Sequence, residues 1–182
     1  MLFSPTSIPE VIEITPKISK DSRGEFLEVY RSAEFAEAGI NLEFVQDNHA
    51  GSYQGVLRGL HYQIQQAQGK LVRVISGEIY DVAVDLRKTS STFGLAVGLK
   101  LSDQKKNQLW IPPGFAHGYY VMSDWVEVSY KVTEYYAPEH ERTLFWNDPQ
   151  LRINWPLISK NHPLLSEKDL QGCLLCEAET YE

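Results

Sequence analysis

The sequence predicts an all-β domain, built as an antiparallel sandwich or barrel with a few short peripheral helices. Short segments rich in β-branched and aromatic residues follow one another through the middle of the chain, and Gly, Pro, Ser or Asp separates them. The chain has 182 residues, of which 43% are hydrophobic and 23% charged, so it can bury a sizeable core. Because no repeat or low-complexity linker divides it, we expect residues 1–182 to form one domain.

Strands are expected over residues 25–30, 70–76, 78–86, 94–101, 108–111, 118–122 and 126–133. In segment 78–86, period-two alternation places Asp81 and Asp85 on one face, opposite Val82 and Val84. This acidic face is either a solvated outer surface or the lining of a polar cavity.

Helical signals are few and lie outside the strand-rich region. Residues 32–38 form a predicted helix with Ser32 as its N-cap, and Gly39 stops it. A second helix is expected to begin at Ser166, because a serine cap followed by acidic residues in the first turn stabilises a helix N-terminus.

The charge balance narrows the classes of ligand. Seventeen basic residues against 24 acidic ones give a net charge of -7, which disfavours nonspecific binding to nucleic acid or to an anionic membrane. The apolar runs are far shorter than the ~20 residues of a membrane span, and residues 1–5 do not resemble a secretory signal. We therefore expect a cytoplasmic protein in which Cys173 and Cys176, a lone Cys-x-x-Cys, stay reduced.

Two stretches have the outline of the paired motifs of cupins, a family of small jelly-roll β-barrels. The first contains His61, and the second, Pro-Pro-Gly-Phe-Ala-His, ends at His117. In metal-binding cupins, the first motif resembles His-x-His followed by Glu. In this chain, Gln63 stands at the second histidine position and no Glu follows closely. A metal centre normally needs roughly three or four such ligands, so we expect no metal.

Without a metal, pocket histidines are suited to acid and base chemistry, because imidazole titrates near neutral pH. Arg58 and His61 share one turn or strand, and Lys70 follows closely, which concentrates positive charge in an acidic chain. Such a group fits an anionic substrate: an Arg fork binds phosphate oxygens and a Lys stabilises a developing enolate. The alternative is that the histidines are core residues and the basic residues form surface ion pairs.

Longer motifs carry a more specific resemblance. In order and spacing, the chain resembles the dTDP-4-dehydrorhamnose 3,5-epimerase family at residues 46–49, 55–63, 69–73, 80–87, 110–118, 130–136 and 138–142. The resemblance extends from residue 21 to residue 169. It implies a cofactor-free, homodimeric cupin enzyme that epimerises C3 and C5 of a dTDP-linked 4-keto-6-deoxyhexose, in dTDP-L-rhamnose synthesis.

The resemblance also implies roles for single residues. His61 matches the base, Asp169 the carboxylate that orients it, Tyr130 the acid that returns a proton to the opposite face, and Lys70 the residue that stabilises the enolate. Substrate contacts are implied for Lys70 and for Arg23, Glu28, Gln46, Asp47, Asn48, Arg58, His117, Glu141 and Lys168. Among them, Arg23 and Arg58 match diphosphate ligands.

Other interpretations of these residues remain open. Glu28 fits a simple surface strand, and Glu141 with Lys168 fits a surface ion pair. Competing functions are a monofunctional 3- or 5-epimerase of a related keto-sugar, a ligand-binding cupin without catalysis, and a metal-dependent oxygenase or isomerase. The presence of both a base and an acid favours the double epimerase. We also expect the N-terminal segment to reach the partner's site in the dimer and to contribute Arg23 or Glu28.

Overall fold

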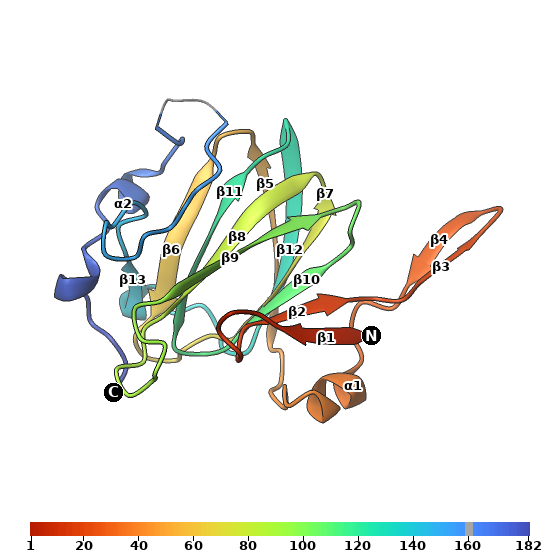
Figure 1. The fold of residues 1–182 in the computed structure, drawn as a ribbon, viewed down its shortest axis with the longest axis horizontal. Helices are drawn as coiled ribbons and strands as arrows, with labels where there is room; N and C mark the ends of the chain where they lie inside the picture. Colours follow the sequence, from red (N-terminus) through yellow and green to blue (C-terminus); the bar gives the residue numbers. More distant parts are fainter. Residues whose placement is uncertain (159–161) are drawn as a thin grey trace.

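Two antiparallel sheets face each other in the computed structural model, which describes residues 1–158 and 162–182 (Figure 1). The six-stranded sheet has the order β1 (Leu2–Pro5), β2 (Ile12–Thr15), β10 (Gln108–Ile111), β7 (Lys70–Ser76), β12 (Trp125–Val132), β5 (Gln46–Tyr53). The five-stranded sheet has the order β13 (Glu141–Thr143), β6 (Leu57–Gln63), β11 (Phe115–Val121), β8 (Glu78–Asp85), β9 (Ala96–Ser102). The predicted all-β antiparallel sandwich is therefore confirmed.

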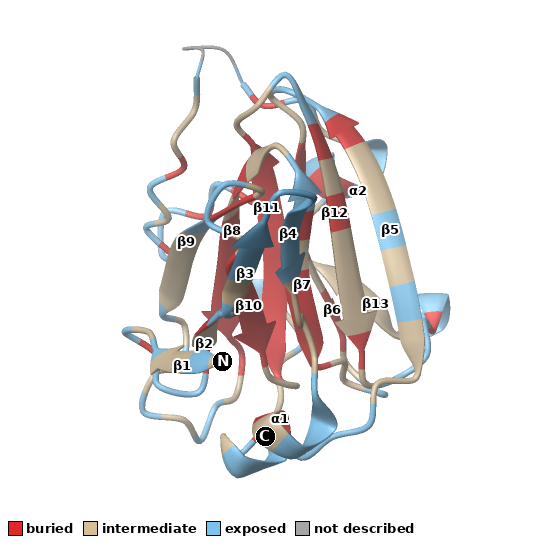
Figure 2. Cartoon of the chain, turned by 90° about the vertical axis from the view of Figure 1, so that its right-hand side faces the viewer, coloured by how far each residue is buried: buried red, intermediate tan, exposed pale blue. Residues whose placement is uncertain are grey.

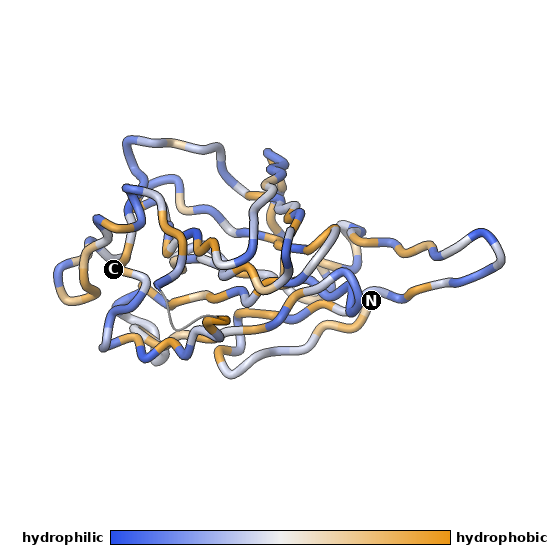
Figure 3. Tube along the Cα trace, turned by 90° about the horizontal axis from the view of Figure 1, so that it is seen from above, coloured by the Kyte–Doolittle hydropathy of each residue, from blue (hydrophilic) through white to orange (hydrophobic). Residues whose placement is uncertain are grey.

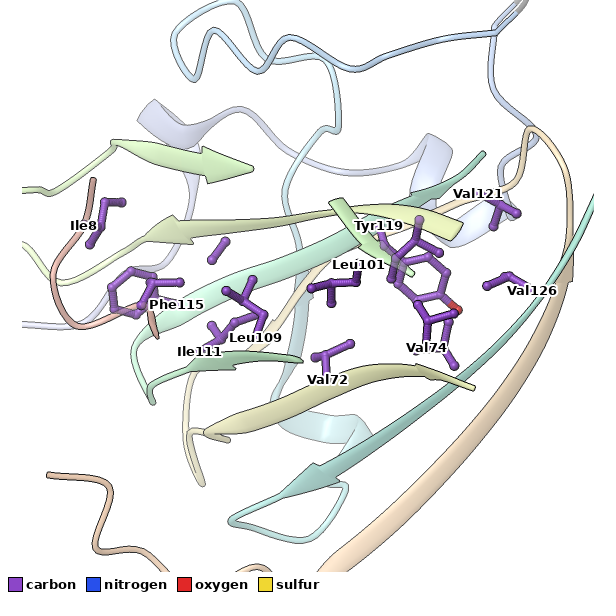
Figure 4. Packing of buried hydrophobic residues seen from close by; sticks show 14 residues of the cluster. Ile8, Val72, Val74, Leu101, Leu109, Ile111, Phe115, Tyr119, Val121 and Val126 are labelled. Atoms are coloured by element: carbon purple, nitrogen blue, oxygen red, sulfur yellow. The ribbon is translucent and has the colours of Figure 1, made fainter. Parts of the chain in front are cut away.

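The main hydrophobic core fills the space between the sheets. Val72 and Leu109 from the six-stranded sheet pack against Leu101 and Phe115 from the other, and all four side chains are buried (Figure 4). Figure 2 shows that β8 and β11, in the middle of the five-stranded sheet, are buried along almost their whole length. A strand covered on both faces is buried whichever way its side chains point, so its polar residues, such as Asp81 and Asp85 of β8, are buried as well.

The C-terminal segment covers the outer face of the five-stranded sheet. Val82 and Val84 of β8 pack there in a second cluster with Trp146 and Trp155. Asp81 lies on the opposite, inner face, and both it and Asp85 are fully buried. Neither carboxylate belongs to a solvated surface, and neither lines the cavity described below: Asp81 binds His117, which does line it, and Asp85 binds Arg87.

The hairpin of β3 (Ile18–Asp21) and β4 (Gly24–Leu27) projects away from the two sheets (Figure 1). Its tip is hydrophilic, as Figure 3 shows, whereas Phe26 presents an aromatic ring that is 74% exposed. The predicted strand 25–30 is therefore wrong beyond Leu27, where the chain leaves the hairpin.

Two helices flank the sandwich. The first, α1 (Ser32–Glu37), has Arg31 at its N-cap without a side-chain cap bond, so the prediction of Ser32 as the cap is wrong. Gly39 ends it as predicted, with a φ of 87° that favours glycine. The second, α2 (Glu167–Leu170), starts with the predicted Ser166 cap. Short 3-10 helices cover Pro138–His140 and Leu175–Glu177.

Most predicted strands lie close to observed ones. Strand β11 starts at Phe115, earlier than the predicted 118, and strands β1, β2, β3, β5, β6 and β13 lie outside the predicted strand segments. Both cysteines are free. Within residues 1–158 and 162–182, no helix is long and apolar enough to cross a membrane.

Candidate active site

A cavity of about 350 Å³ lies between the two sheets. Strands β5, β7 and β12 line it on one side, and β6, β11 and β13 on the other. Its lining contains nine residues that the sequence analysis selected: Gln46, Asn48, Arg58, His61, Lys70, His117, Tyr130, Glu141 and Lys168. Residues far apart in the sequence thus converge on one pocket.

Strand β6 carries a bulge that aims two functional side chains at this cavity. His61 pairs with His117 of β11, but Arg58 pairs with Tyr119, so β6 has one residue more than β11 between these pairs. Simple alternation would place Arg58 and His61 on opposite faces of the strand. The extra residue of a bulge shifts the alternation by one, and both side chains line the cavity.

Gly59 makes the bulge possible. Its φ of 122° is in the region that favours glycine, and a Cβ atom there would lie 2.5 Å from the Cα of Gly118 on β11. Two glycines facing each other let the strands approach closely beside His61 and His117. The amide of Gly59 also donates to Oδ1 of Asp169, at 3.3 Å, which connects the bulge to α2.

His61 and Asp169 form a hydrogen-bonded pair, with Nε2 of the ring 2.6 Å from Oδ1 of the carboxylate. The His61 side chain is 23% exposed, whereas that of Asp169 is 3% exposed. Because an ionised carboxylate only accepts hydrogen bonds, Nε2 carries the proton and Nδ1 has the lone pair. The carboxylate therefore fixes the ring in the tautomer of a base.

The sequence around Asp169 explains how it reaches that position. Asp169 is the third residue of α2 and completes the capping box: its Oδ2 accepts from the Ser166 hydroxyl at 2.7 Å, and its own amide donates to that hydroxyl. Burial acts to raise the pKa of Asp169, but the hydrogen bonds from His61 and Ser166 outweigh it and lower the pKa. One carboxylate thus caps a helix and orients a base.

Burial lowers the pKa of His61, and the hydrogen bond from its ring to Asp169 opposes that effect. The positive charges of Lys168 and Lys70 lower this pKa further. The ring is therefore held in its neutral form near neutral pH, as a general base must be.

Lys70 begins β7 on the opposite sheet and reaches across the cavity, where its Nζ donates to the backbone oxygen of His61 at 3.4 Å. Burial lowers the pKa of Lys70 to about 8, against the opposing effects of Asp81 and Glu141. Lys70 is therefore a largely protonated ammonium beside the base at neutral pH.

Tyr130 comes from β12, in the six-stranded sheet, whereas His61 comes from the five-stranded sheet. Burial raises the pKa of the Tyr130 phenol, and the positive charge of Arg58 opposes this rise. Tyr130 thus remains a protonated phenol that can donate. The base and the phenol line one cavity from opposite sheets.

Glu141 and Lys168 form an ion pair at the rim, with Nζ and Oε1 2.8 Å apart. The Tyr136 hydroxyl donates to the other oxygen of Glu141 at 2.8 Å. The ion pair that was the alternative interpretation of Glu141 and Lys168 therefore exists, but all three side chains also line the cavity.

Arg58 is oriented by Ser52 of β5, whose hydroxyl accepts from Nε at 3.0 Å. On the same strand, Gln46 donates to the side chain of Asn48 at 2.8 Å. Gln46, Asn48 and Ser52 follow the period of two that places alternate residues of a strand on one face. One terminal nitrogen of Arg58 donates to the backbone oxygen of Gly51 at 3.4 Å, and the guanidinium lines the cavity, where its charge suits an anionic ligand.

Three predicted contacts do not line the cavity within this chain. Asp47 alternates with its neighbours on β5 and forms an ion pair with Lys131 at 2.8 Å. Arg23, at the tip of the projecting hairpin, pairs with Asp21 of the same hairpin. Glu28 follows the hairpin and pairs with Arg31.

The cavity also contains residues that the sequence analysis missed: Ala50, Gln68, Tyr119 and Tyr136. Tyr119 follows His117 by two residues on β11, and Ala50 follows Asn48 by two on β5, so period-two alternation was a usable signal. Gln68 and Tyr136 lie in loops, where no periodicity identifies a facing side chain.

The donor atoms do not fit a metal centre of the cupin kind. Gln63, at the position of the missing ligand, uses its amide to bind the backbone of Gln66, Tyr135 and Ala137. Within the described parts of the chain, no three His, Cys, Asp or Glu side chains are grouped as metal ligands. No chemical step is therefore assigned to a metal.

Comparisons with known proteins agree on one family. A sequence model described as dTDP-4-dehydrorhamnose 3,5-epimerase matches residues 5–177. The dTDP-4-dehydrorhamnose 3,5-epimerase of Pseudomonas aeruginosa is 56% identical over 176 residues, covering 96% of this chain and 96% of that protein. The enzyme of the same name from Methanothermobacter thermautotrophicus is 50% identical over 179 residues, covering 98% and 97%.

Solved structures resemble this fold closely. The dTDP-6-deoxy-D-glucose-3,5-epimerase of Legionella pneumophila, crystallised with dTDP-4-keto-L-rhamnose, superposes with a TM-score of 0.94 at 50% identity, covering 98% of this chain and 94% of that one. A 3'-monoepimerase from Streptomyces bikiniensis, crystallised with dTDP-quinovose, gives a TM-score of 0.88 at 31% identity, covering 95% and 87%.

Proposed function

Because the chain belongs to the dTDP-4-dehydrorhamnose 3,5-epimerase family, we propose that it converts dTDP-4-dehydro-6-deoxy-D-glucose to dTDP-4-dehydro-L-rhamnose, in dTDP-L-rhamnose synthesis. The reaction inverts the configuration at C3 and at C5. Both carbons are adjacent to the C4 ketone, so loss of either proton gives an enolate that a nearby cation stabilises. The cupin-type sandwich supplies a pocket lined with polar and charged side chains for this chemistry.

His61 is the base in this proposal. Its Nδ1 lone pair removes the proton from C3 or C5, and the Asp169 carboxylate stabilises the imidazolium that forms. Lys70 places its ammonium near the C4 oxygen, where negative charge develops.

Inversion requires that the new proton arrive on the face opposite to the base. The observation that carries the proposal is the placement of His61 and Tyr130 on opposite sheets around one cavity. A sugar ring held between them presents one face to His61 and the other to Tyr130. Protonation by the phenol then yields the inverted centre. A solvent proton restores the phenol, and the His61 imidazolium releases its proton to solvent, so both groups are ready for the second carbon.

The remaining polar side chains suit the dTDP group. Arg58 can bind diphosphate oxygens through its guanidinium, and Gln46 and Asn48 extend the polar surface beside it. Lys168 adds a positive charge at the rim, where Glu141 limits its movement. These contacts position the sugar, which accounts for much of catalysis in reactions of bound substrates.

We further propose that the protein is a homodimer in the cytoplasm. The hairpin of β3 and β4 carries Arg23 at its turn, Arg23 does not line this chain's own cavity, and Phe26 exposes a large aromatic side chain on the same hairpin. In a two-fold dimer, this hairpin would bring Arg23 or Glu28 to the partner's site. Sedimentation analysis should give a dimer, and a stable, fully active monomer would contradict the proposal.

One competing function has specific support. The structural likeness to a 3'-monoepimerase leaves a reaction at C3 alone as the second candidate. Incubation of the protein with dTDP-4-dehydro-6-deoxy-D-glucose in deuterated water, followed by NMR, separates the two. The proposal expects deuterium at both C3 and C5 and the L-rhamno configuration. Exchange at one carbon would establish the monoepimerase, and exchange at neither would overturn both.

A further inference from the structure

The cavity contains a second histidine bound to a buried carboxylate. Nε2 of His117 lies 3.0 Å and 2.9 Å from the two oxygens of Asp81 on the neighbouring strand β8. Asp81 is fully buried and His117 is 7% exposed. The His117–Asp81 pair lies beside the His61–Asp169 pair, because His117 and His61 are direct partners across β11 and β6. None of the roles assigned so far uses Asp81.

The contact with Asp81 determines which nitrogen of His117 is free. An ionised carboxylate accepts a hydrogen bond from Nε2, so Nε2 carries a proton whether the ring is neutral or charged. Within residues 1–158 and 162–182, the structure gives the ring no other hydrogen bond, and His117 lines the cavity. Nδ1 is therefore the ring nitrogen left for a ligand.

Asp81 also acts on Lys70. The groups that face the Lys70 ammonium are His61 on β6, Asp81 on β8, Glu141 on β13 and Lys168 on α2, together with the Tyr130 phenol on β12. Burial lowers the pKa of Lys70, and the charge of Asp81 is the largest influence that raises it. A buried ammonium that must stay charged therefore depends on this carboxylate.

We propose that Asp81 is a positioning residue of this site: it holds the His117 ring through Nε2 so that Nδ1 faces the substrate. The charge of the same carboxylate also raises the pKa of Lys70, on the other sheet, so the Lys70 titration gives a second readout. The claim that Nδ1 of His117 faces the substrate rests on the proposed function. A neutral His117 would accept a hydrogen bond from a sugar hydroxyl at Nδ1.

The tautomer of His117 can be measured without turnover. Two-bond 1H–15N correlation spectra of 15N-labelled protein show which ring nitrogen carries the proton, and the signals of His117 are assigned by their loss in His117→Gln. The wild-type protein should carry the proton on Nε2. Asp81→Asn should populate both tautomers, because an amide can donate to Nε2 as well as accept from it. A wild-type ring protonated on Nδ1 alone would overturn the inference, even if no variant folds.

The charge of Lys70 is measured in parallel. In protein labelled with 13C-lysine, the Cε shift of Lys70 is followed against pH and assigned by its loss in Lys70→Arg. The titration midpoint should fall by roughly one pH unit in Asp81→Asn, the usual size of the effect of a nearby charge. In Asp81→Glu, which keeps the charge, the titration midpoint of Lys70 should stay close to the wild-type value.

Asp85→Asn is the matched control. Asp85 lies on the same strand and is equally buried, but it binds Arg87, which does not line the cavity, whereas Asp81 binds His117, which does. The Asp85→Asn variant should leave the His117 tautomer and the titration midpoint of Lys70 unchanged. Equal shifts in both Asn variants, or no shift in Asp81→Asn, would contradict a specific role for Asp81.

Activity provides the last comparison. The basic limb of the kcat profile against pH should move to lower pH in Asp81→Asn by the same amount as the Lys70 midpoint, and Asp85→Asn should keep the parent profile. An inactive wild-type protein would overturn the proposed function alone, because the spectra would still decide the role of Asp81.

Discussion

Nε2 of His61 lies 2.6 Å from Oδ1 of Asp169, although 108 positions separate the two residues in the chain. The same carboxylate accepts from the amide of Gly59 and from the hydroxyl of Ser166. A strand bulge and a helix cap thus meet at one side chain. The orientation of the base is therefore built from local structure at both ends of the pair.

Asp169→Asn should weaken the base without removing it. Asp169 raises the pKa of His61, so its replacement lowers that pKa further and makes the imidazole a poorer base. Since the neutral ring is the active form, the acidic limb of the rate profile should move to lower pH. We expect a loss in kcat smaller than the 10²- to 10⁴-fold contribution of general base catalysis. An unchanged acidic limb, measured by steady-state kinetics between pH 5 and 9, would argue against the pair.

The sequence predicted this pairing only through family resemblance and helix capping. The Ser166 cap and its acidic first turn are local features, and α2 begins where they predict. The side of β6 that His61 faces was not predictable from alternation, because the bulge at Gly59 changes it.

Strands β5 and β6 escaped the strand prediction for a related reason. Their inward positions carry polar residues such as Asn48, Ser52 and His61, since they line a polar cavity rather than the apolar core. The pattern that predicts a strand is apolar alternation, and a strand that builds the site lacks it. Nine of the predicted site residues nonetheless line one cavity, although they come from strands that apolar alternation does not reveal, because residue type and motif order identified them.

Gly118→Ala should disturb the site through packing. A Cβ atom at residue 118 would lie 2.7 Å from the backbone oxygen of Arg58 and 3.1 Å from Cα of Gly59. Backbone atoms cannot move away as a side-chain end can, so β6 and β11 must separate. We expect the free energy of unfolding to fall by roughly 1–3 kcal/mol, the usual cost of overpacking, and kcat to fall with it. Urea unfolding at the parent value would show that the strands have room.

Asp85→Asn should reduce stability in a pH-dependent way. Burial acts to raise the pKa of Asp85, but hydrogen bonds from Arg87, Ser90 and Thr92 hold it at about 2. A lowered pKa stabilises the folded state at pH values above the unfolded pKa of about 3.9, and this contribution is lost as the pH falls toward 2. The variant should lose about 2 kcal/mol near neutral pH, by linkage.

Urea titrations at several pH values measure this difference. The gap between wild type and Asp85→Asn should be constant from pH 7 down to about pH 5 and narrow below pH 4. A gap that stays the same at pH 3 would show that the loss comes from packing rather than from charge.

Exhaustive treatment with EDTA should leave the activity unchanged. The prediction follows from the donor set, in which His61 and His117 are each bound by a carboxylate and Gln63 faces backbone groups. Metal analysis of the treated protein must accompany the assay. Loss of activity that one divalent metal restores would disprove the metal-free mechanism.

The central claim is that His61 removes the proton and Tyr130 returns it from the opposite side of the sugar. The two roles separate in deuterated water, because His61→Ala prevents deprotonation whereas Tyr130→Phe prevents only reprotonation on the opposite face. Tyr135→Phe serves as the control, since Tyr135 is 63% exposed and does not line the cavity.

The most direct measurement is therefore deuterium exchange at C3 and C5 of dTDP-4-dehydro-6-deoxy-D-glucose, followed by NMR for these three variants and the wild type. Exchange should fall roughly 10²- to 10⁴-fold or more at both carbons in His61→Ala. Tyr130→Phe should keep some exchange with retained configuration and form little inverted product, and Tyr135→Phe should match the wild type. Inversion of both centres at the parent rate by Tyr130→Phe, or normal exchange by His61→Ala, would contradict the assigned roles.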